Sequence, residues 1–72
     1  MRLDSAKRIC VEVYDVLGRR VRRLADGMLG AGIHEVVWDV RDGHGTMVAA
    51  GTYFYRVTAG DRTETGKIVV VR

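Results

Sequence analysis

The chain has 72 residues and a mass of 8.0 kDa, enough for one domain over residues 1–72 but not for a second hydrophobic core. Its composition, 47% hydrophobic and 29% charged, is too apolar for a disordered chain. The net charge of +3 reflects one cluster of four arginines, because the other eight of the twelve basic residues face nine acidic ones.

The first clear periodicity lies at residues 8–14. Ile9, Val11 and Val13 alternate with polar or small residues, which predicts a strand with one buried face. Residues 15–18 then have the composition of a tight hairpin connection, in which Gly18 supplies a positive φ.

Residues 17–29 allow two interpretations. Their apolar residues recur at helical spacing, but Gly18 and Gly27 would each cost a helix about 1 kcal/mol. As a strand, the segment needs a bulge or a bend between Val21 and Leu24, because these side chains have opposite parity. We favour a strand followed by a loop, and the helix is the alternative.

Three further segments, residues 34–39, 52–59 and 67–71, show the alternation or the β-branched composition of strands. Gly60 and Asp61 form a two-residue hairpin signal between the last two. This spacing of strands and turns predicts a small antiparallel sandwich. The expected inward-facing residues are Ile9, Val11, Val13, Val21, Val36, Trp38, Tyr53, Tyr55, Val57, Ile68 and Val70.

The residue types that perform nucleophilic catalysis are few: Ser5, Cys10, His34 and His44. Ser5 lies near a terminus, and Cys10 falls between the expected core residues Ile9 and Val11 with its side chain on the opposite face. No nucleophile, base and orienting group can be assembled from this set. The sequence therefore predicts no catalytic or cofactor-binding residue and a protein that is not an enzyme.

The densest polar segment contains Asp39, Asp42 and His44, which suggests a metal site at first sight. Their spacing does not fit a calcium loop, and a single cysteine excludes a multi-cysteine zinc site. Short Asp side chains beside glycines are typical of tight loops, where they accept backbone N–H groups. We expect turn chemistry here and no metal.

The arginine cluster consists of Arg19, Arg20, Arg22 and Arg23. No aromatic residue lies between Tyr14 and Trp38 to stack on nucleic-acid bases. We therefore interpret the cluster as a solvated face. Nucleic-acid binding through it is a weaker alternative, which requires the helical interpretation of residues 17–29.

Residues 13–19, 38–45 and 51–57 together resemble the immunoglobulin-like domain of flagellar hook-capping proteins. They also resemble the similar C-terminal sorting domain of the type IX (Por) secretion system. The resemblance covers about residues 9–72, including an ending, residues 67–72, that is similar to the terminal strand of such domains. It is carried by Tyr14, Asp15, Gly18, Trp38, Asp39, Asp42, Gly45, Gly51, Tyr53 and Tyr55. It implies an all-β, immunoglobulin-like antiparallel sandwich of six to seven short strands.

Two departures from the family pattern matter. Val40 stands where the family usually has glycine, so a rearranged turn is expected there. The family commonly begins with a further strand, for which only Arg2, Leu3 and Asp4 remain here. A truncated first strand would expose an edge, and we expect self-association or strand addition from the attached polypeptide.

The resemblance implies a non-catalytic C-terminal accessory module of an exported bacterial protein, acting in sorting, surface attachment or assembly. The implied location is extracellular, on the cell surface or periplasmic. Residues 1–72 contain no signal peptide or membrane-spanning run, so any export signal is expected outside them. The alternative is a self-assembling subunit whose copies complete one another's sheets. The expected partner-contact face consists of Arg8, Glu12, Tyr14, Phe54 and Arg56.

Overall fold

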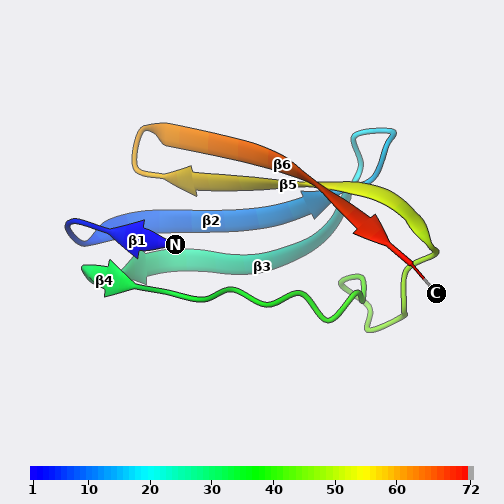
Figure 1. Cartoon of the computed structure of the whole chain (residues 1–72). Helices are drawn as coiled ribbons and strands as arrows, with labels where there is room; N and C mark the ends of the chain where they lie inside the picture. The colour runs from blue at the N-terminus through cyan, green and yellow to red at the C-terminus, as the bar shows by residue number, and fades with distance from the viewer. Residues whose placement is uncertain (72) are drawn as a thin grey trace.

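The computed structural model describes residues 1–71, which form six strands in two antiparallel sheets and no helix (Figure 1). The larger sheet has the order β3-β2-β5-β6, and β1 pairs with β4 in a smaller sheet. The prediction of an all-β sandwich is confirmed. The strands are β1 (Arg2–Leu3), β2 (Lys7–Tyr14), β3 (Arg20–Leu29), β4 (Gly32–Ile33), β5 (Gly51–Ala59) and β6 (Arg62–Val70).

The connection between β2 and β3 is the predicted hairpin. Gly18 has a φ of 81°, and its N–H donates to the Asp15 carbonyl at 3.0 Å. The Asp15 side chain closes the turn: its Oδ1 accepts the N–H groups of Leu17 and Arg19 at 2.9 and 3.0 Å. Its Oδ2 accepts Arg19 Nε at 2.9 Å, so a short carboxylate satisfies three donors of this loop.

Replacing Asp15 with alanine is expected to lower the free energy of unfolding by about 1 kcal/mol, because two backbone donors of the turn lose their acceptor. Asp15→Asn keeps an amide oxygen at the same place and should cost less than half as much. Urea denaturation of both variants tests this. Equal losses for the two would contradict the role given to the acceptor oxygen.

Residues 20–29 form strand β3, so the helical interpretation is wrong. The register passes from Val11 opposite Ala25 to Glu12 opposite Arg23, which leaves Leu24 as an extra residue. A second shift, between Val13 and Tyr14, does the same for Val21. These bulges turn Val21 and Leu24 toward the core, which reconciles their apolar spacing with an extended chain.

Residues 34–39 were predicted to be a strand, and this prediction is wrong. Strand β4 ends at Ile33, one residue before His34. The N-terminal amine of Met1 donates to the His34 carbonyl at 2.8 Å, and the His34 N–H donates to the Met1 carbonyl at 2.7 Å. Beyond that pair, no other strand within residues 1–71 lies beside residues 35–39 to form a ladder with them.

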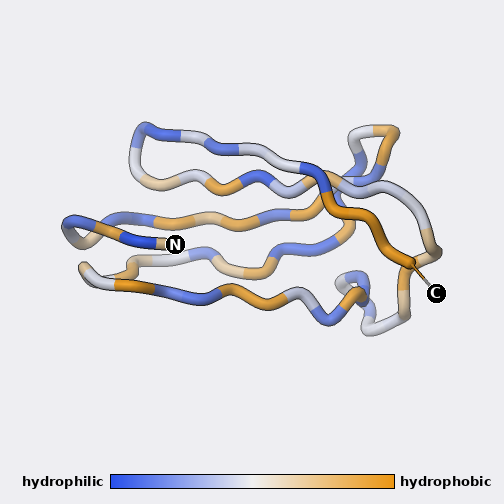
Figure 2. Tube along the Cα trace, viewed as in Figure 1, coloured by the Kyte–Doolittle hydropathy of each residue, from blue (hydrophilic) through white to orange (hydrophobic). Residues whose placement is uncertain are grey.

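The other strand predictions are confirmed. Ala59 pairs with Arg62 around the two-residue turn at Gly60, and β6 begins earlier than its apolar run predicts. The hydrophobic end of β6 is the orange stretch near the C-terminus in Figure 2. Arg72, the last residue of the ending that resembles the family, lies outside the described residues.

The core lies between the larger sheet and the layer formed by β1, β4 and residues 34–50. Trp38 is half-buried and meets Tyr53 edge to face, with ring centroids 5.4 Å apart. Leu3 and Val48 are buried but were not predicted, and Val36, predicted to be buried, is exposed. The buried apolar residues are Leu3, Ile9, Val11, Val13, Val48, Tyr53 and Val70, and Val21, Trp38, Val57 and Ile68 pack against them from half-buried positions.

Candidate protein-contact site

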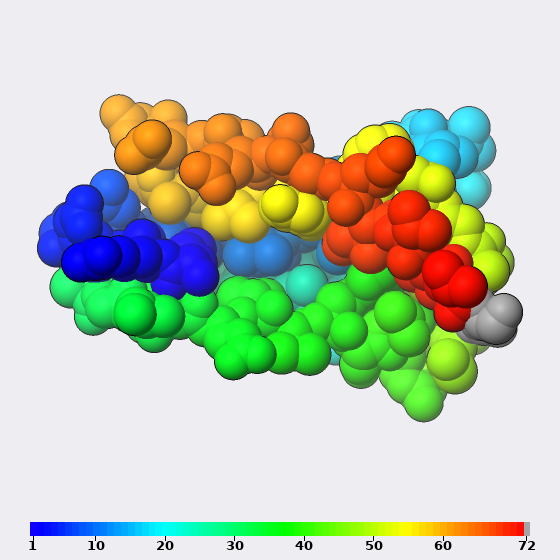
Figure 3. Space-filling view, viewed as in Figure 1, coloured from blue at the N-terminus to red at the C-terminus, as the bar shows by residue number. Residues whose placement is uncertain are grey.

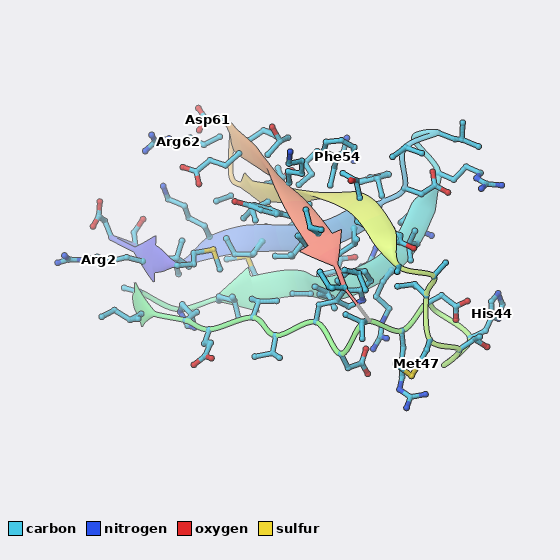
Figure 4. All side chains as sticks on the ribbon, turned by 45° about the vertical axis from the view of Figure 1, so that its right-hand side comes forward. Arg2, His44, Met47, Phe54, Asp61 and Arg62 are labelled. Carbon is cyan, nitrogen blue, oxygen red and sulfur yellow. The ribbon has the colours of Figure 1, made fainter. Side chains whose placement is uncertain are left out.

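The outer face of the larger sheet carries the predicted partner-contact residues. The register sets Tyr14 opposite Phe54 and Glu12 opposite Arg56, so residues from β2 and β5 share this face. Phe54 points away from residues 34–40 and is 42% exposed (Figure 4). Arg8 lies further along β2 on the same face, where its Nη2 is 3.2 Å from Asp26 Oδ1. The sheet thus brings the five predicted residues to one surface.

Glu12 is the centre of this face and is buried, although its position in the alternation predicted exposure. Its Oε1 accepts hydrogen bonds from Tyr14 Oη at 3.0 Å and from Arg56 Nη2 at 3.1 Å. Its Oε2 accepts Arg20 Nη1 at 3.2 Å and lies 3.6 Å from Arg23 Nη2. Three arginines, each about half exposed, therefore cover one carboxylate.

Arg56 ties this arrangement together. Its guanidinium carbon lies 4.9 Å from the centroid of the Tyr14 ring, and its Nη2 also donates to the Tyr14 hydroxyl. Burial and the hydrogen bond to Glu12 raise the pKa of Tyr14, so its hydroxyl stays protonated and can donate. The face is consequently positive and locally rigid, with an aromatic and a guanidinium group at its surface.

Burial would raise the pKa of Glu12, but hydrogen bonds from Arg56, Tyr14 and Arg20 outweigh it and lower that pKa from 4.5 to about 2. Burial and the Glu12 carboxylate raise the pKa of the neighbouring Cys10 thiol. A thiol is a nucleophile only as the thiolate, so this environment disfavours the chemistry for which Cys10 was considered.

The four arginines of the basic cluster line one pocket, but their ion pairs divide them among different acids. Arg20 and Arg23 form ion pairs with Glu12, whereas Arg19 pairs with Asp15 in the hairpin. Arg22 points the other way, where its Nη1 lies 3.1 Å from Asp39 Oδ1 and donates to the carbonyls of residues 41 and 42. The bulged course of β3 divides the cluster, and the nucleic-acid alternative loses the helix on which it depended.

The segment considered for metal binding is a tight loop. Asp42 Oδ1 accepts the N–H groups of His44 and Thr46 at 2.9 and 3.0 Å, and Asp39 Oδ1 accepts the Arg41 N–H at 3.1 Å. This is the turn chemistry that the sequence predicted. These backbone N–H groups also lower the pKa of Asp42.

The same loop explains why one of its positions favours glycine. Val40 has a φ of 56°, a left-handed conformation that a β-branched residue rarely adopts. The Val40 carbonyl still accepts the Val48 N–H at 2.9 Å. Valine therefore takes the backbone conformation that glycine would adopt more easily.

A groove of about 680 Å³ lies on the inner side of the sandwich, and neither its shape nor its position was predicted. Its floor consists of Val11, Val13 and Leu24, and one wall is formed by Tyr55, Val57 and Ile68. Figure 3 shows the hollow between the green segment and the yellow and orange strands, with β2 visible at its floor.

The sequence contained one signal for this wall, namely a glycine within a strand. Gly66 lies opposite Tyr55, and the Tyr55 ring covers it so closely that a Cβ on Gly66 would overlap the ring. The glycine lets the ring lie flat along β6. The Tyr55 ring, lying over Gly66, therefore forms this wall of the groove.

A small antiparallel sandwich of two sheets is the architecture of an immunoglobulin-like domain. Comparison with known proteins agrees: residues 2–63 match the family described as FlgD Ig-like domain. The chain belongs to this family, and the resemblance to the hook-capping immunoglobulin-like domain is confirmed. Within residues 1–71, no helix is long and apolar enough to cross a membrane.

Two curated relatives are the basal-body rod modification protein FlgD of Salmonella typhimurium and that of Salmonella typhi. Each is 38% identical to the chain over 58 residues, which is 81% of this chain and 25% of the relative. The chain therefore spans about a quarter of the length of these relatives. No solved structure matches the chain.

Proposed function

We propose that the chain is a non-catalytic assembly module that binds other proteins through the outer face of its larger sheet, in the manner implied by the hook-capping family. The single observation that supports this most is the family match over residues 2–63. The relatives' name, basal-body rod modification protein, is consistent with a role in building a flagellar structure.

The outer face offers a means of contact. Phe54 and Arg56 are exposed beside each other on β5 and Tyr14 lies across from them, which is the mixture of aromatic and arginine side chains that protein interfaces favour. The arginines outnumber the acids on this face, so we expect an acidic or neutral partner surface.

A chimera tests the proposal. The 58 aligned residues of the Salmonella typhimurium relative are replaced by the corresponding residues of this chain, and motility and hook formation are compared with those of the parent and of a deletion of the same segment. The proposal predicts that the chimera assembles and the deletion does not. A soluble, folded chimera that behaves like the deletion would contradict it.

A paired substitution separates the outer face from the rest of the domain. Phe54→Ala together with Arg56→Ala should reduce assembly by the chimera. Ile33→Ala, an exposed apolar change on β4 of the smaller sheet, should leave it unchanged. Equal effects of both changes would remove the outer face from the proposal.

Sorting through the type IX system, surface attachment and a location outside the cytoplasm stay predictions implied by the resemblance. Secretion of a reporter carrying this chain by a type IX host would support sorting. Self-assembly of copies of this chain is the remaining alternative, and sedimentation at high micromolar concentration tests it: a strict monomer would contradict it.

A further inference from the structure

Residues 35–39 form an extended segment without a neighbouring strand. Their alternation is that of a strand, with Val36 and Trp38 lining the groove and Glu35 and Val37 exposed. This segment borders the groove along the side opposite β6, as the space-filling view shows (Figure 3). The question is what the segment and the groove together can bind.

The pairing of β1 with β4 shows in which direction the backbone groups of residues 35–39 point. Met1 and His34 exchange both backbone hydrogen bonds, which makes them a hydrogen-bonded antiparallel pair. Hydrogen-bonded and non-hydrogen-bonded pairs alternate along an antiparallel ladder. Residues 36 and 38 therefore have the same orientation as His34. Their N–H and C=O groups point toward the place where a strand continuing β1 beyond Met1 would lie. Within residues 1–71, no strand pairs with this edge.

The groove beside this edge suits the side chains of an added strand. A residue opposite Val36 or Trp38 would point inward, toward the partly exposed side chains of Leu24, Val57 and Tyr55. A volume of about 680 Å³ accommodates several aliphatic side chains. On the outer side, an added residue opposite Glu35 would stand beside its carboxylate, whereas the Asp39 carboxylate is already paired with Arg22.

We propose that this groove binds an extended segment of a partner polypeptide by strand addition. The segment runs antiparallel to residues 35–39 and in the same direction as β1. It carries apolar side chains opposite Val36 and Trp38, and a basic or hydroxyl side chain opposite Glu35. This surface is distinct from the outer face, and the proposal does not rest on the flagellar role.

Electrostatics disfavours a second copy of this chain as the occupant. If two copies paired through residues 35–39 with their groove-facing side chains aligned, Val37 would lie opposite its own copy. Glu35 of each copy would then face Asp39 of the other, which brings a second carboxylate to the single arginine, Arg22, that pairs with Asp39, and so destabilises the strand pair. A partner segment with a basic residue opposite Glu35 meets no such repulsion.

The first test fixes the register by fusing the five residues KVTIK directly before Met1, so that isoleucine and valine fall opposite Val36 and Trp38. The control fusion, VKIKT, has the same composition with reversed alternation. Hydrogen exchange is followed by NMR in the full chain. We expect the amides of Val36 and Trp38 to exchange at least tenfold more slowly with KVTIK, while that of Val37 changes less. Equal protection by the two fusions would overturn the proposal.

The second test asks whether the strand can come from another molecule. The capped peptide KVTIK is added at millimolar concentration to the unextended chain, and saturable shifts of the Val36 and Trp38 amides are expected. Val36→Asn should abolish them and Val37→Asn should not, with Trp38 fluorescence reporting that both variants fold. If the fusion protects the Val36 and Trp38 amides but the free peptide causes no shifts, the strand must be covalently attached, and the proposal of a separate partner molecule is overturned. Protection that rises with protein concentration and accompanies dimers would overturn it in favour of a second copy.

Discussion

Replacing Ile9 with alanine is expected to lower the free energy of unfolding by about 3 kcal/mol, the largest effect of any single change considered for this chain. Ile9 is fully buried, and Leu3 and Val11 are buried in the same cluster. It lies on β2, which has neighbours on both sides, so the surrounding strands have little freedom to close the cavity. For a chain of this size such a loss should lower Tm by about 12–24 °C.

Ile33→Ala provides the matched control, because Ile33 also lies in a strand but is 84% exposed. Its free energy of unfolding should change by less than about 0.5 kcal/mol. Urea denaturation followed by Trp38 fluorescence measures both variants. A loss at Ile9 no larger than that at Ile33 would mean that the cluster of Leu3, Ile9 and Val11 is not packed as described.

Replacing Glu12 with glutamine should lower the free energy of unfolding at neutral pH by about 2 kcal/mol. The Glu12 pKa falls from 4.5 to about 2 on folding, and a shift of this size would be worth about 3 kcal/mol for a fully enclosed carboxylate. Because its arginine partners are about half exposed, water screens part of this interaction.

The contribution of Glu12 to the free energy of unfolding should depend on pH in a definite direction. A depressed folded-state pKa stabilises the protein above the unfolded-state value, and the contribution disappears as the pH falls from about 5 to about 2. The difference between the parent and Glu12→Gln should therefore be full at pH 6 and should vanish near pH 2. Glu64→Gln, an exposed change on β6, is the control and should change the free energy of unfolding by less than about 0.5 kcal/mol. A difference between the parent and Glu12→Gln that is independent of pH would show that the charge of Glu12 is not the source of the effect.

Local pattern was sufficient to predict the parts of the fold that depend on nearest neighbours. The alternation of Ile9, Val11 and Val13 predicted β2, and the Asp and Gly composition of residues 15–18 predicted the hairpin that follows. The opposite parity of Val21 and Leu24 even indicated a bulge, although two were needed. In each case the physical information lies within a few residues.

Features that depend on distant strands escaped prediction. Residues 34–39 have a strand pattern but no ladder beyond the pair formed by Met1 and His34, since pairing requires a neighbour as well as a propensity. The burial of Glu12 follows from arginines 8 and 44 residues away, at Arg20 and Arg56. Val48 is buried from a loop that has no periodicity.

The central pair of the larger sheet also sets how this chain reaches its native state. Strands β2 and β3, like β5 and β6, meet through short turns and can zip quickly, whereas joining β2 to β5 must first close a loop of residues 15–50. This non-local step carries the entropic barrier, so folding should take milliseconds or longer despite the small size of the domain. Until it occurs, two hairpins with exposed apolar faces coexist, and the chain is then at its most vulnerable to aggregation.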